Sequence, residues 1–170
     1  MVGSIGMLFL AGCQMGKEAE EEITVIEATS QPGNLSVTLE GRWSLLEPGK
    51  LPENQSCDLL AEDALTDAGI SIVYEDLTLT EGGSLIRMEE YLALMQEKLT
   101  AEDAYTYTCE EVTTREIAGE TYYTFTALEE TLGARLHYFV RRIGDTVMIM
   151  TITLYDGSGP ENLLNGMRAV

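Results

Sequence analysis

Apolar runs in the C-terminal half of the chain predict the strands that form its core. Three consecutive runs are rich in Tyr, Thr, Val, Ile, Phe and Met, which favour strands: Glu120–Leu128, Ala134–Ile143 and Thr146–Leu154. The segments between them, Glu129–Gly133 and Gly144–Asp145, are short turns. The spacing therefore predicts a β-meander at the centre of one small domain.

Further strands are predicted earlier in the chain. Leu35–Glu40 alternates between apolar and polar residues, as a half-buried strand does. Ile70–Tyr74 is a second strand, and the sequence at 66–69 before it is typical of a hairpin turn. Cys57–Ala64 fits a short helix or a strand, and the turn that follows favours the strand. Tyr105–Ile117 is also strand-like.

Two helices are predicted, Ser84–Leu99 and Ser158–Val170, because apolar residues recur in both at helical spacing. The strand Thr146–Leu154 is apolar on both faces, with Val147 and Ile149 on one face and methionines and aliphatic residues on the other. A sheet of this kind has to be covered on both sides. The prediction is therefore an α+β fold in which a largely antiparallel sheet is covered by helices on both faces.

An apolar run at the N-terminus bears on cellular location. Val2–Ala11 is too short to span a membrane as a helix and has the size of the apolar region of a secretory signal. Leu10–Cys13 reads Leu-Ala-Gly-Cys and resembles the bacterial lipobox, in which the Cys is diacylated and the chain is cut just before it. The resemblance implies that residues 1–12 are a lipoprotein signal peptide and that Cys13 is lipidated. The protein would then be lipid-anchored at the extracytoplasmic face of the cell membrane. The alternative is a buried N-terminal strand with an ordinary core cysteine.

The segment that follows Cys13 is polar and acidic. Residues 13–33 contain four nearly contiguous glutamates, Glu18, Glu20, Glu21 and Glu22. Such a run stays solvated, so we predict a tether that holds a single domain, residues 34–170, off the membrane. In the alternative interpretation, Ile23–Ile26 is a first edge strand. No Lys or Arg precedes the apolar run, where signals carry positive charge, and a start codon assigned too far downstream would explain this.

The order of elements resembles a known family. A strand ending near Trp43 is followed by the strand Ile70–Glu75, a helix with Met88–Leu92, the segment Ile117–Gly119 before the meander, and a short closing helix. This layout is similar to the PsbP/Mog-like α/β/α sandwich found in small secreted lipoproteins of Firmicutes-type bacteria, and the similarity covers Asn34–Val170. It implies a module that binds partners or helps to assemble them, with no shared catalytic residue.

The charge of the chain excludes several classes of partner. Ten Lys and Arg stand against 29 Asp and Glu, giving a formal net charge of −19. A chain this acidic is repelled by phosphate backbones, so we expect no nucleic-acid partner. Binding to anionic lipid through a basic patch is excluded for the same reason.

Candidate catalytic and metal-binding residues do not converge in the sequence. His137 is the one histidine, and no second metal ligand is positioned beside it, so we interpret it as a structural or surface residue. The acidic pairs are interpreted as solvated surface, since adjacent residues on a strand point to opposite faces. These pairs are Glu75/Asp76, Glu89/Glu90, Glu102/Asp103, Glu110/Glu111 and Glu129/Glu130. Calcium-loop and phosphate-loop patterns are missing. We therefore predict no catalytic residue, cofactor or metal, and no enzyme activity.

Two cysteines remain besides Cys13. Cys57 and Cys109 either form a disulfide, which an extracytoplasmic location permits, or are two reduced thiols. The sequence alone leaves both states open.

The functional prediction follows from these points. We expect a membrane-anchored, extracytoplasmic lipoprotein that acts as a non-catalytic binding or assembly module for a protein or cell-envelope partner. The alternative is an envelope hydrolase with a carboxylate-based site assembled from residues distant in the sequence.

Overall fold

The structure, a computed structural model, describes residues 23–170. The predicted signal peptide, the predicted lipidation site Cys13 and the first part of the predicted tether lie outside the described residues. Within residues 23–170, no helix has the length and apolar character needed to cross a membrane.

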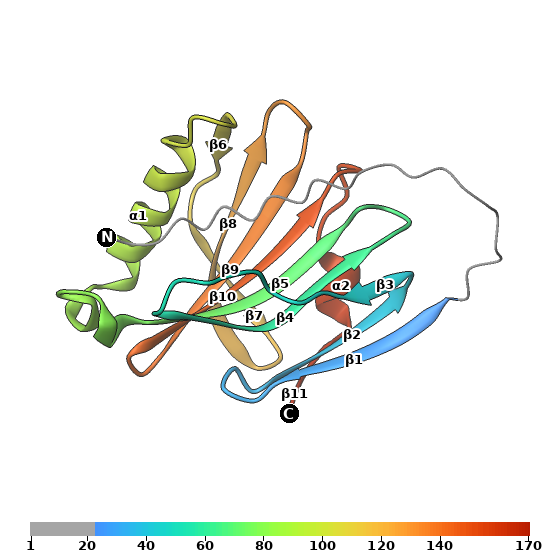
Figure 1. Cartoon of the computed structure of the whole chain (residues 1–170), viewed down its shortest axis with the longest axis horizontal. Helices are drawn as coiled ribbons and strands as arrows, with labels where there is room; N and C mark the ends of the chain where they lie inside the picture. The colour runs from blue at the N-terminus through green and yellow to red at the C-terminus, as the bar shows by residue number, and fades with distance from the viewer. Residues whose placement is uncertain (1–22) are drawn as a thin grey trace.

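A large antiparallel sheet forms the body of the domain (Figure 1). Its eight strands follow the order β3-β4-β5-β10-β9-β8-β6, and β7 also pairs with β8. The strands are β3 (Trp43–Leu45), β4 (Gln55–Asp63), β5 (Gly69–Asp76), β6 (Tyr107–Cys109), β7 (Thr113–Ile117), β8 (Glu120–Glu129), β9 (Arg135–Ile143) and β10 (Thr146–Leu154). The predicted meander is confirmed as β8, β9 and β10, and the strand interpretation of Cys57–Ala64 is confirmed as β4.

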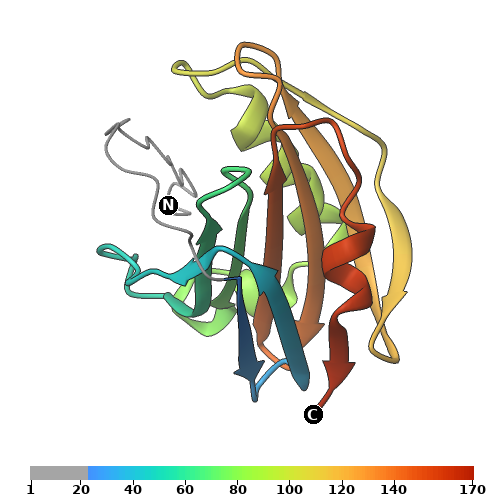
Figure 2. The same cartoon turned by 90° about the vertical axis from the view of Figure 1, so that its right-hand side faces the viewer.

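A smaller sheet lies against the large one and has the order β1-β2-β11. Its strands are β1 (Thr24–Ser30), β2 (Leu35–Gly41) and β11 (Met167–Ala169). The inward side chains of β2 are fully buried and belong to the same apolar core as residues of the large sheet. Figure 2 shows the short helix α2 (Glu161–Asn165) leading into β11, which pairs with β2.

Two apolar cores occupy the two faces of the large sheet. Along β10, Met148 and Met150 contribute to the core shared with the small sheet and α2, whereas Val147 and Ile149 contribute to the other. The second core lies beneath α1 (Met88–Thr100), whose buried residues are Tyr91, Leu92 and Met95. The predicted alternation along this strand is therefore confirmed.

The prediction of helices on both faces of the sheet is wrong. The helix α1 packs on one face, while the other face is covered mainly by the small sheet, with α2 beside it. The described residues contain two α-helices and two 3-10 helices, η1 (Leu77–Leu79) and η2 (Gly83–Leu85). The protein is mostly antiparallel sheet, arranged as two sheets in layers with one long helix.

The predicted closing helix Ser158–Val170 is correspondingly too long. After the C-cap residue Gly166 the backbone becomes extended, and Met167 pairs with Val37 of β2. Val170 is 57% exposed, so it does not continue the apolar stripe of a helix. Pairing with a distant strand takes the place of the last part of the predicted helix, and local periodicity does not reveal that such a strand is available.

The folded domain also begins earlier than predicted. β1 pairs with β2 over its full length, from Thr24 opposite Gly41 to Ser30 opposite Leu35. The tether prediction is therefore wrong for residues 24–30, and the alternative of an early edge strand is confirmed. Ser30 connects the two sheets, because its hydroxyl donates to Asp58 Oδ2 at 2.7 Å and contacts the hydroxyl of Tyr74.

The helix α1 begins at Met88 and not at the predicted Ser84. The Glu90 carboxylate accepts the backbone N–H of Arg87 at 3.1 Å and pairs with the Arg87 guanidinium at 3.0 Å. This capping arrangement satisfies a backbone donor that the first helical turn leaves unpaired. Ser84 lies in η2 instead, where Gly83 approaches the Leu77 carbonyl too closely for any side chain.

The two described cysteines are free and lie far apart in the large sheet. Cys57 is on β4 and Cys109 on β6, which are separated by five strand-to-strand steps. At about 4.8 Å per step this is a distance of about 24 Å, whereas a disulfide needs Cα atoms about 4–7 Å apart. The structure thus favours the reduced state over a bridge between these two residues.

We expect both thiols to alkylate slowly in the native protein at neutral pH. Burial raises the pKa of Cys57 and of Cys109, and the thiolate is the reactive form. The rate of reaction with iodoacetamide should therefore rise as the pH is raised towards these elevated values. In a Cys13→Ala variant unfolded without reductant, mass spectrometry should find two adducts; a chain that takes up none would contradict the assignment.

Candidate functional site

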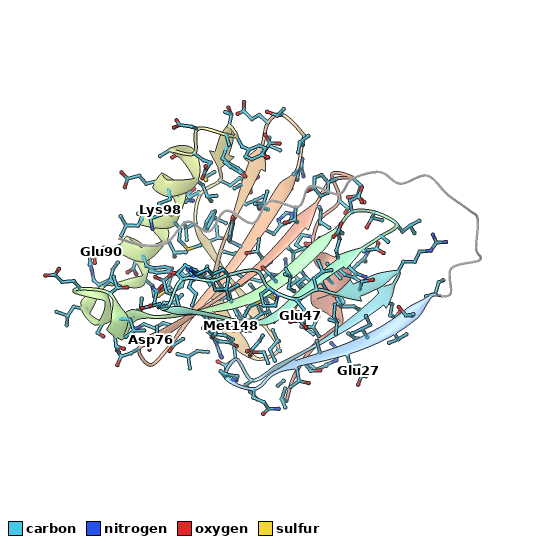
Figure 3. All side chains as sticks on the ribbon, viewed as in Figure 1. Glu27, Glu47, Asp76, Glu90, Lys98 and Met148 are labelled. Atoms are coloured by element: carbon cyan, nitrogen blue, oxygen red, sulfur yellow. The ribbon has the colours of Figure 1, made fainter. Side chains whose placement is uncertain are left out.

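A cavity of about 290 Å³ opens between α1, the end of β5 and the two 3-10 helices. Its walls are largely apolar, being formed by Leu77, Ile86, Leu94, Met95, Leu99 and Tyr138. Three charged residues, Glu75, Lys98 and Glu102, also line it. Figure 3 labels Lys98 on α1 and Asp76 at the end of β5, the two elements between which the cavity lies. An apolar cavity with a few polar groups is the usual form of a ligand site.

Glu75 is the unusual residue of this cavity. It is 1% exposed, and the strand alternation of β5 places it on the α1 side of the sheet, opposite to Ile72 and Tyr74. Tyr91 Oη donates to Glu75 Oε2 at 2.5 Å, and Asn54 Nδ2 donates to Oε1 at 3.2 Å. A carboxyl group in such surroundings is tolerated because its oxygens are hydrogen-bonded.

Burial and the Glu75 carboxylate shift the pKa values of two neighbouring side chains, Tyr91 and Lys98. The pKa of Tyr91 is raised strongly, first by burial and then by the hydrogen bond to the Glu75 carboxylate. The pKa of Lys98 is lowered by desolvation, and the negative charge of Glu75 opposes that effect. Tyr91 therefore keeps its proton and remains a hydrogen-bond donor throughout the physiological pH range.

One arginine fixes the loop that forms the rim of the cavity. Arg142 Nη1 donates to the Ile86 carbonyl at 2.7 Å, and Nη2 donates to the Ser84 carbonyl at 2.7 Å. Arg142 Nε also donates to the Gly144 carbonyl at 2.8 Å. The guanidinium thereby attaches η2 to the β9–β10 turn, so the rim is held in place by β9.

Exposed leucines surround this rim. Leu79 is 64% exposed, Leu85 is 87% exposed and Leu94 is 42% exposed. Leu94 lines the cavity itself, and the other two belong to the 3-10 helices η1 and η2, each of which contributes its first residue, Leu77 or Gly83, to the lining. Large apolar side chains gathered at the mouth of an apolar cavity are typical of a surface that contacts a partner.

Replacing Tyr91 by phenylalanine tests the role of its hydroxyl. We expect the free energy of unfolding to fall by about 1.5–3 kcal/mol, because the buried Glu75 carboxylate loses a charge-assisted hydrogen bond. Urea denaturation of the variant would measure the change. The matched control is Tyr123→Phe, since no hydrogen bond of the Tyr123 hydroxyl is found in the described structure, and it should change stability by less than about 0.5 kcal/mol. Equal effects of the two substitutions on stability would show that the hydrogen bond from Tyr91 to Glu75 does not stabilise the fold.

The structure revises the interpretation of two acidic pairs as solvated surface. Glu75 is buried in the cavity, and Glu129 is 3% exposed. The Glu129 carboxylate accepts the backbone N–H groups of Thr131 and Leu132 at 2.9 and 2.6 Å, so it holds the β8–β9 turn. Both members of the pairs Glu89/Glu90, Glu102/Asp103 and Glu110/Glu111 are exposed, as predicted.

His137 lies away from the cavity, on the opposite face of the large sheet. Its side chain is 9% exposed, and its Nδ1 atom lies 3.1 Å from the Thr126 hydroxyl. Burial lowers its pKa, so the imidazole is neutral at neutral pH. Among residues 23–170, no group of three or more His, Cys, Asp or Glu side chains could hold a metal ion.

Sequence reasoning did not identify the cavity. Glu75 stands next to Asp76 and has the appearance of surface charge, and Tyr91 and Met95 match an ordinary core stripe. One signal was available: Glu75 directly follows Ile70–Tyr74, a run that is apolar except for Ser71 and is therefore typical of a strand buried on both faces.

Comparison with known proteins identifies the fold. Neither the protein-family models nor the curated proteins include a match to this sequence. The solution structure of cyanobacterial PsbP (CyanoP) from Synechocystis sp. PCC 6803 matches with a TM-score of 0.60 at 8% identity, over 92% of this chain and 98% of that one. A crystal structure from Bacteroides thetaiotaomicron VPI-5482 has a TM-score of 0.44 at 12% identity, over 85% of this chain and 48% of that one, which is too distant to support an argument.

The chain therefore has a PsbP-like fold, which confirms that part of the predicted family resemblance. An origin among small lipoproteins of Firmicutes-type bacteria stays a prediction. At 8% identity the likeness concerns the fold alone, and the functional residues have to be taken from this chain itself.

Proposed function

We propose that this PsbP-like domain is a non-catalytic binding module, and that the cavity beside Glu75 receives an apolar side chain of a protein partner. The observation that carries the proposal is the cavity of about 290 Å³, with exposed leucines on its rim. A large apolar side chain in a fitting pocket, surrounded by weaker contacts, is the usual energetic centre of a protein interface.

The charge of the chain favours a basic partner. The formal net charge is −19, and the cavity itself has two carboxylates, Glu75 and Glu102, against one ammonium group, Lys98. A basic surface on the partner would be steered towards this domain and would associate faster at low salt. Acidic proteins and nucleic acids would be repelled.

The proposed location remains the extracytoplasmic face of the membrane, with a lipid at Cys13. Because β1 begins at Thr24, ten residues separate Cys13 from the first strand. At most about 3.5 Å per residue, the anchor would lie within roughly 40 Å of the small sheet. A partner of this module would accordingly be a membrane protein, or a protein held near the membrane.

Site-specific photocrosslinking tests the partner site. A photoreactive amino acid at Leu85 should give a discrete crosslinked product in cells, because Leu85 is at the rim. The same amino acid at Leu132, which is 60% exposed in the β8–β9 turn, should give none. The same products from both positions, or products from neither, would reject the proposed site.

A second pair of variants separates binding from folding. Leu94→Trp places a bulky ring at the mouth of the cavity and should lower the affinity for the crosslinked partner by at least about tenfold. Leu132→Trp adds the same ring at a position remote from the cavity and should leave affinity unchanged.

The lipid anchor is tested separately. Labelled palmitate should be incorporated into the protein and should be lost in Cys13→Ala, while Cys57→Ala should retain the label. If Cys13→Ala were labelled as strongly as the unaltered protein, the proposed membrane location would be wrong. The proposal for the cavity would not be affected.

One observation favours the alternative function, an envelope hydrolase. Residues distant in the sequence, Glu110, Glu111, Glu161 and His137, line one groove of the large sheet. Hydrolysis would require two of these groups to act on one bond as acid and base. Release of reducing ends from cell-wall polymer by the purified protein, lost in Glu161→Gln, would establish this alternative.

A further inference from the structure

The groove that contains His137 is separate from the cavity and lies on the face of the large sheet that carries the small sheet. Its floor is made by neighbouring side chains of β7, β8 and β9, including Thr113, Thr124, Thr126 and His137. Register explains this grouping, because Thr113 is opposite Thr124 and Thr126 is opposite His137. The groove is open to solvent, with a volume of about 500 Å³, which is sufficient for a small organic ligand.

His137, which lines this groove, has an unsatisfied hydrogen-bonding atom. Its Nδ1 atom is next to the Thr126 hydroxyl, but its buried Nε2 atom has no hydrogen-bond partner in the described structure. On β10 the residue opposite His137 is the fully buried Ile152, which offers no polar group. Buried polar atoms are nearly always paired in native proteins, so an unpaired one indicates a missing partner such as a ligand or a water molecule.

Charged groups of both signs stand around the groove. The acidic residues are Glu110, Glu111 and Glu161, and the basic ones are Arg115 and Arg135. Arg115 Nη1 pairs with Glu161 Oε1 at 3.3 Å, and Arg135 Nη1 donates to the Gly157 carbonyl at 3.5 Å. Donors and acceptors therefore both line the site, with three carboxylates against two guanidinium groups.

This composition excludes several ligand classes. An anion would meet three carboxylates against two guanidinium groups, one of which is already paired with Glu161, on a chain of net charge −19. A metal ion would lack a ligand set, since no group of three suitable side chains exists within residues 23–170. An apolar ligand would desolvate threonine, arginine and glutamate side chains without pairing them.

A molecule with several hydroxyl groups satisfies all of these constraints. Each hydroxyl both donates and accepts, so it can pair with a carboxylate, a guanidinium, a threonine or either tautomer of the imidazole. We propose that the groove binds a neutral saccharide, one hydroxyl of which pairs with His137 Nε2. This proposal does not depend on the partner site beside Glu75, which lies on the opposite face of the large sheet.

The single histidine makes the proposal directly measurable. In full-length protein labelled with ¹⁵N-histidine, every imidazole signal belongs to His137, because the chain has no other histidine. Maltotriose, mannotriose and chitotriose serve as probes, with glycerol and sodium phosphate as controls. We expect at least one trisaccharide to shift the imidazole signals saturably, and both controls to leave them in place.

A matched pair of exposed variants identifies the groove as the binding site. Glu161→Gln removes a rim carboxylate and should weaken binding of the active trisaccharide about tenfold, the effect of losing one hydrogen bond to a charged group. Glu97→Gln makes the same change on α1, on the other face of the large sheet, and should have no effect.

Three results would overturn the proposal: no trisaccharide shifts the imidazole signals, phosphate shifts them as much as the sugars do, or Glu161→Gln binds as tightly as the unaltered protein. In the first case the partner of Nε2 is a water molecule. Crosslinking from Leu85 would be unchanged in every case, so the two sites are judged independently.

Discussion

Replacing Leu39 by alanine should lower the free energy of unfolding by about 2–5 kcal/mol, the range found for large-to-small changes in packed cores. Leu39 is fully buried on β2, in the core that the small sheet shares with the large one. The loss would show that β1, β2 and β11 are an integral layer of the fold. Urea denaturation followed by circular dichroism would measure it.

The matched control for this prediction is Leu45→Ala. Leu45 lies on β3 and is 59% exposed, so the same atoms are removed without opening a cavity. Its stability should change by less than about 0.5 kcal/mol. If the two variants were equally stable, the small sheet would contribute little to the fold, and residues before Trp43 would be better described as an appendage.

Replacing Arg142 by methionine should lower the free energy of unfolding by about 2–4 kcal/mol and release the rim of the cavity. Arg142 donates hydrogen bonds to the Ser84 and Ile86 carbonyls, and bonds that involve a charged group contribute about 1.5–3 kcal/mol each, although the two are not fully additive. Methionine keeps much of the apolar stem and removes the donors. Hydrogen exchange should become faster at residues 83–86 and stay unchanged in β8.

Arg135→Met is the control for this second prediction. Arg135 lies on the same strand, and its bond to the Gly157 carbonyl is long, at 3.5 Å, and exposed. We expect a change in stability below about 0.5 kcal/mol. If hydrogen exchange at residues 83–86 were no faster in Arg142→Met than in Arg135→Met, other contacts would hold η2 in place. The rim of the cavity would then not depend on β9.

The parts of the fold that were predictable from the sequence are those with a strong local pattern. In β10, Val147 and Ile149 separate from Met148 and Met150 because a strand directs successive side chains to opposite faces. In β2, Leu35, Val37 and Leu39 show the same rule with one face half-exposed. These strands can be predicted without information about the strands that pair with them.

The parts that were not predictable depend on contacts between distant segments. In β1, Val25 is exposed, and the inward positions carry Ala28 and Ser30 beside Ile26, so the apolar pattern reveals a strand only weakly. Leu163, Leu164 and Met167 fit a helical stripe, yet Met167 belongs to a strand because β2 is available to pair with it. The local pattern of apolar residues does not show whether a distant strand is available for pairing.

The candidate sites were hidden for a related reason. The sequence indicates Glu75 as solvated surface charge and His137 as a structural or surface residue, because their partners come from other elements: Tyr91 from α1 for Glu75, and Thr126 from β8 for His137. A titratable residue without a nearby motif gives no indication of which residues the fold will bring to it.

The position of β11 in the small sheet has a consequence for biosynthesis. Met167 pairs with Val37, which emerges from the ribosome about 130 residues earlier, so the layer built on β2 stays incomplete until residues 167–169 have also emerged. Long-range pairing of this kind slows folding and leaves apolar side chains of β2 uncovered in the meantime. The small sheet is therefore completed later than the meander, whose strands β8, β9 and β10 follow one another directly in the sequence.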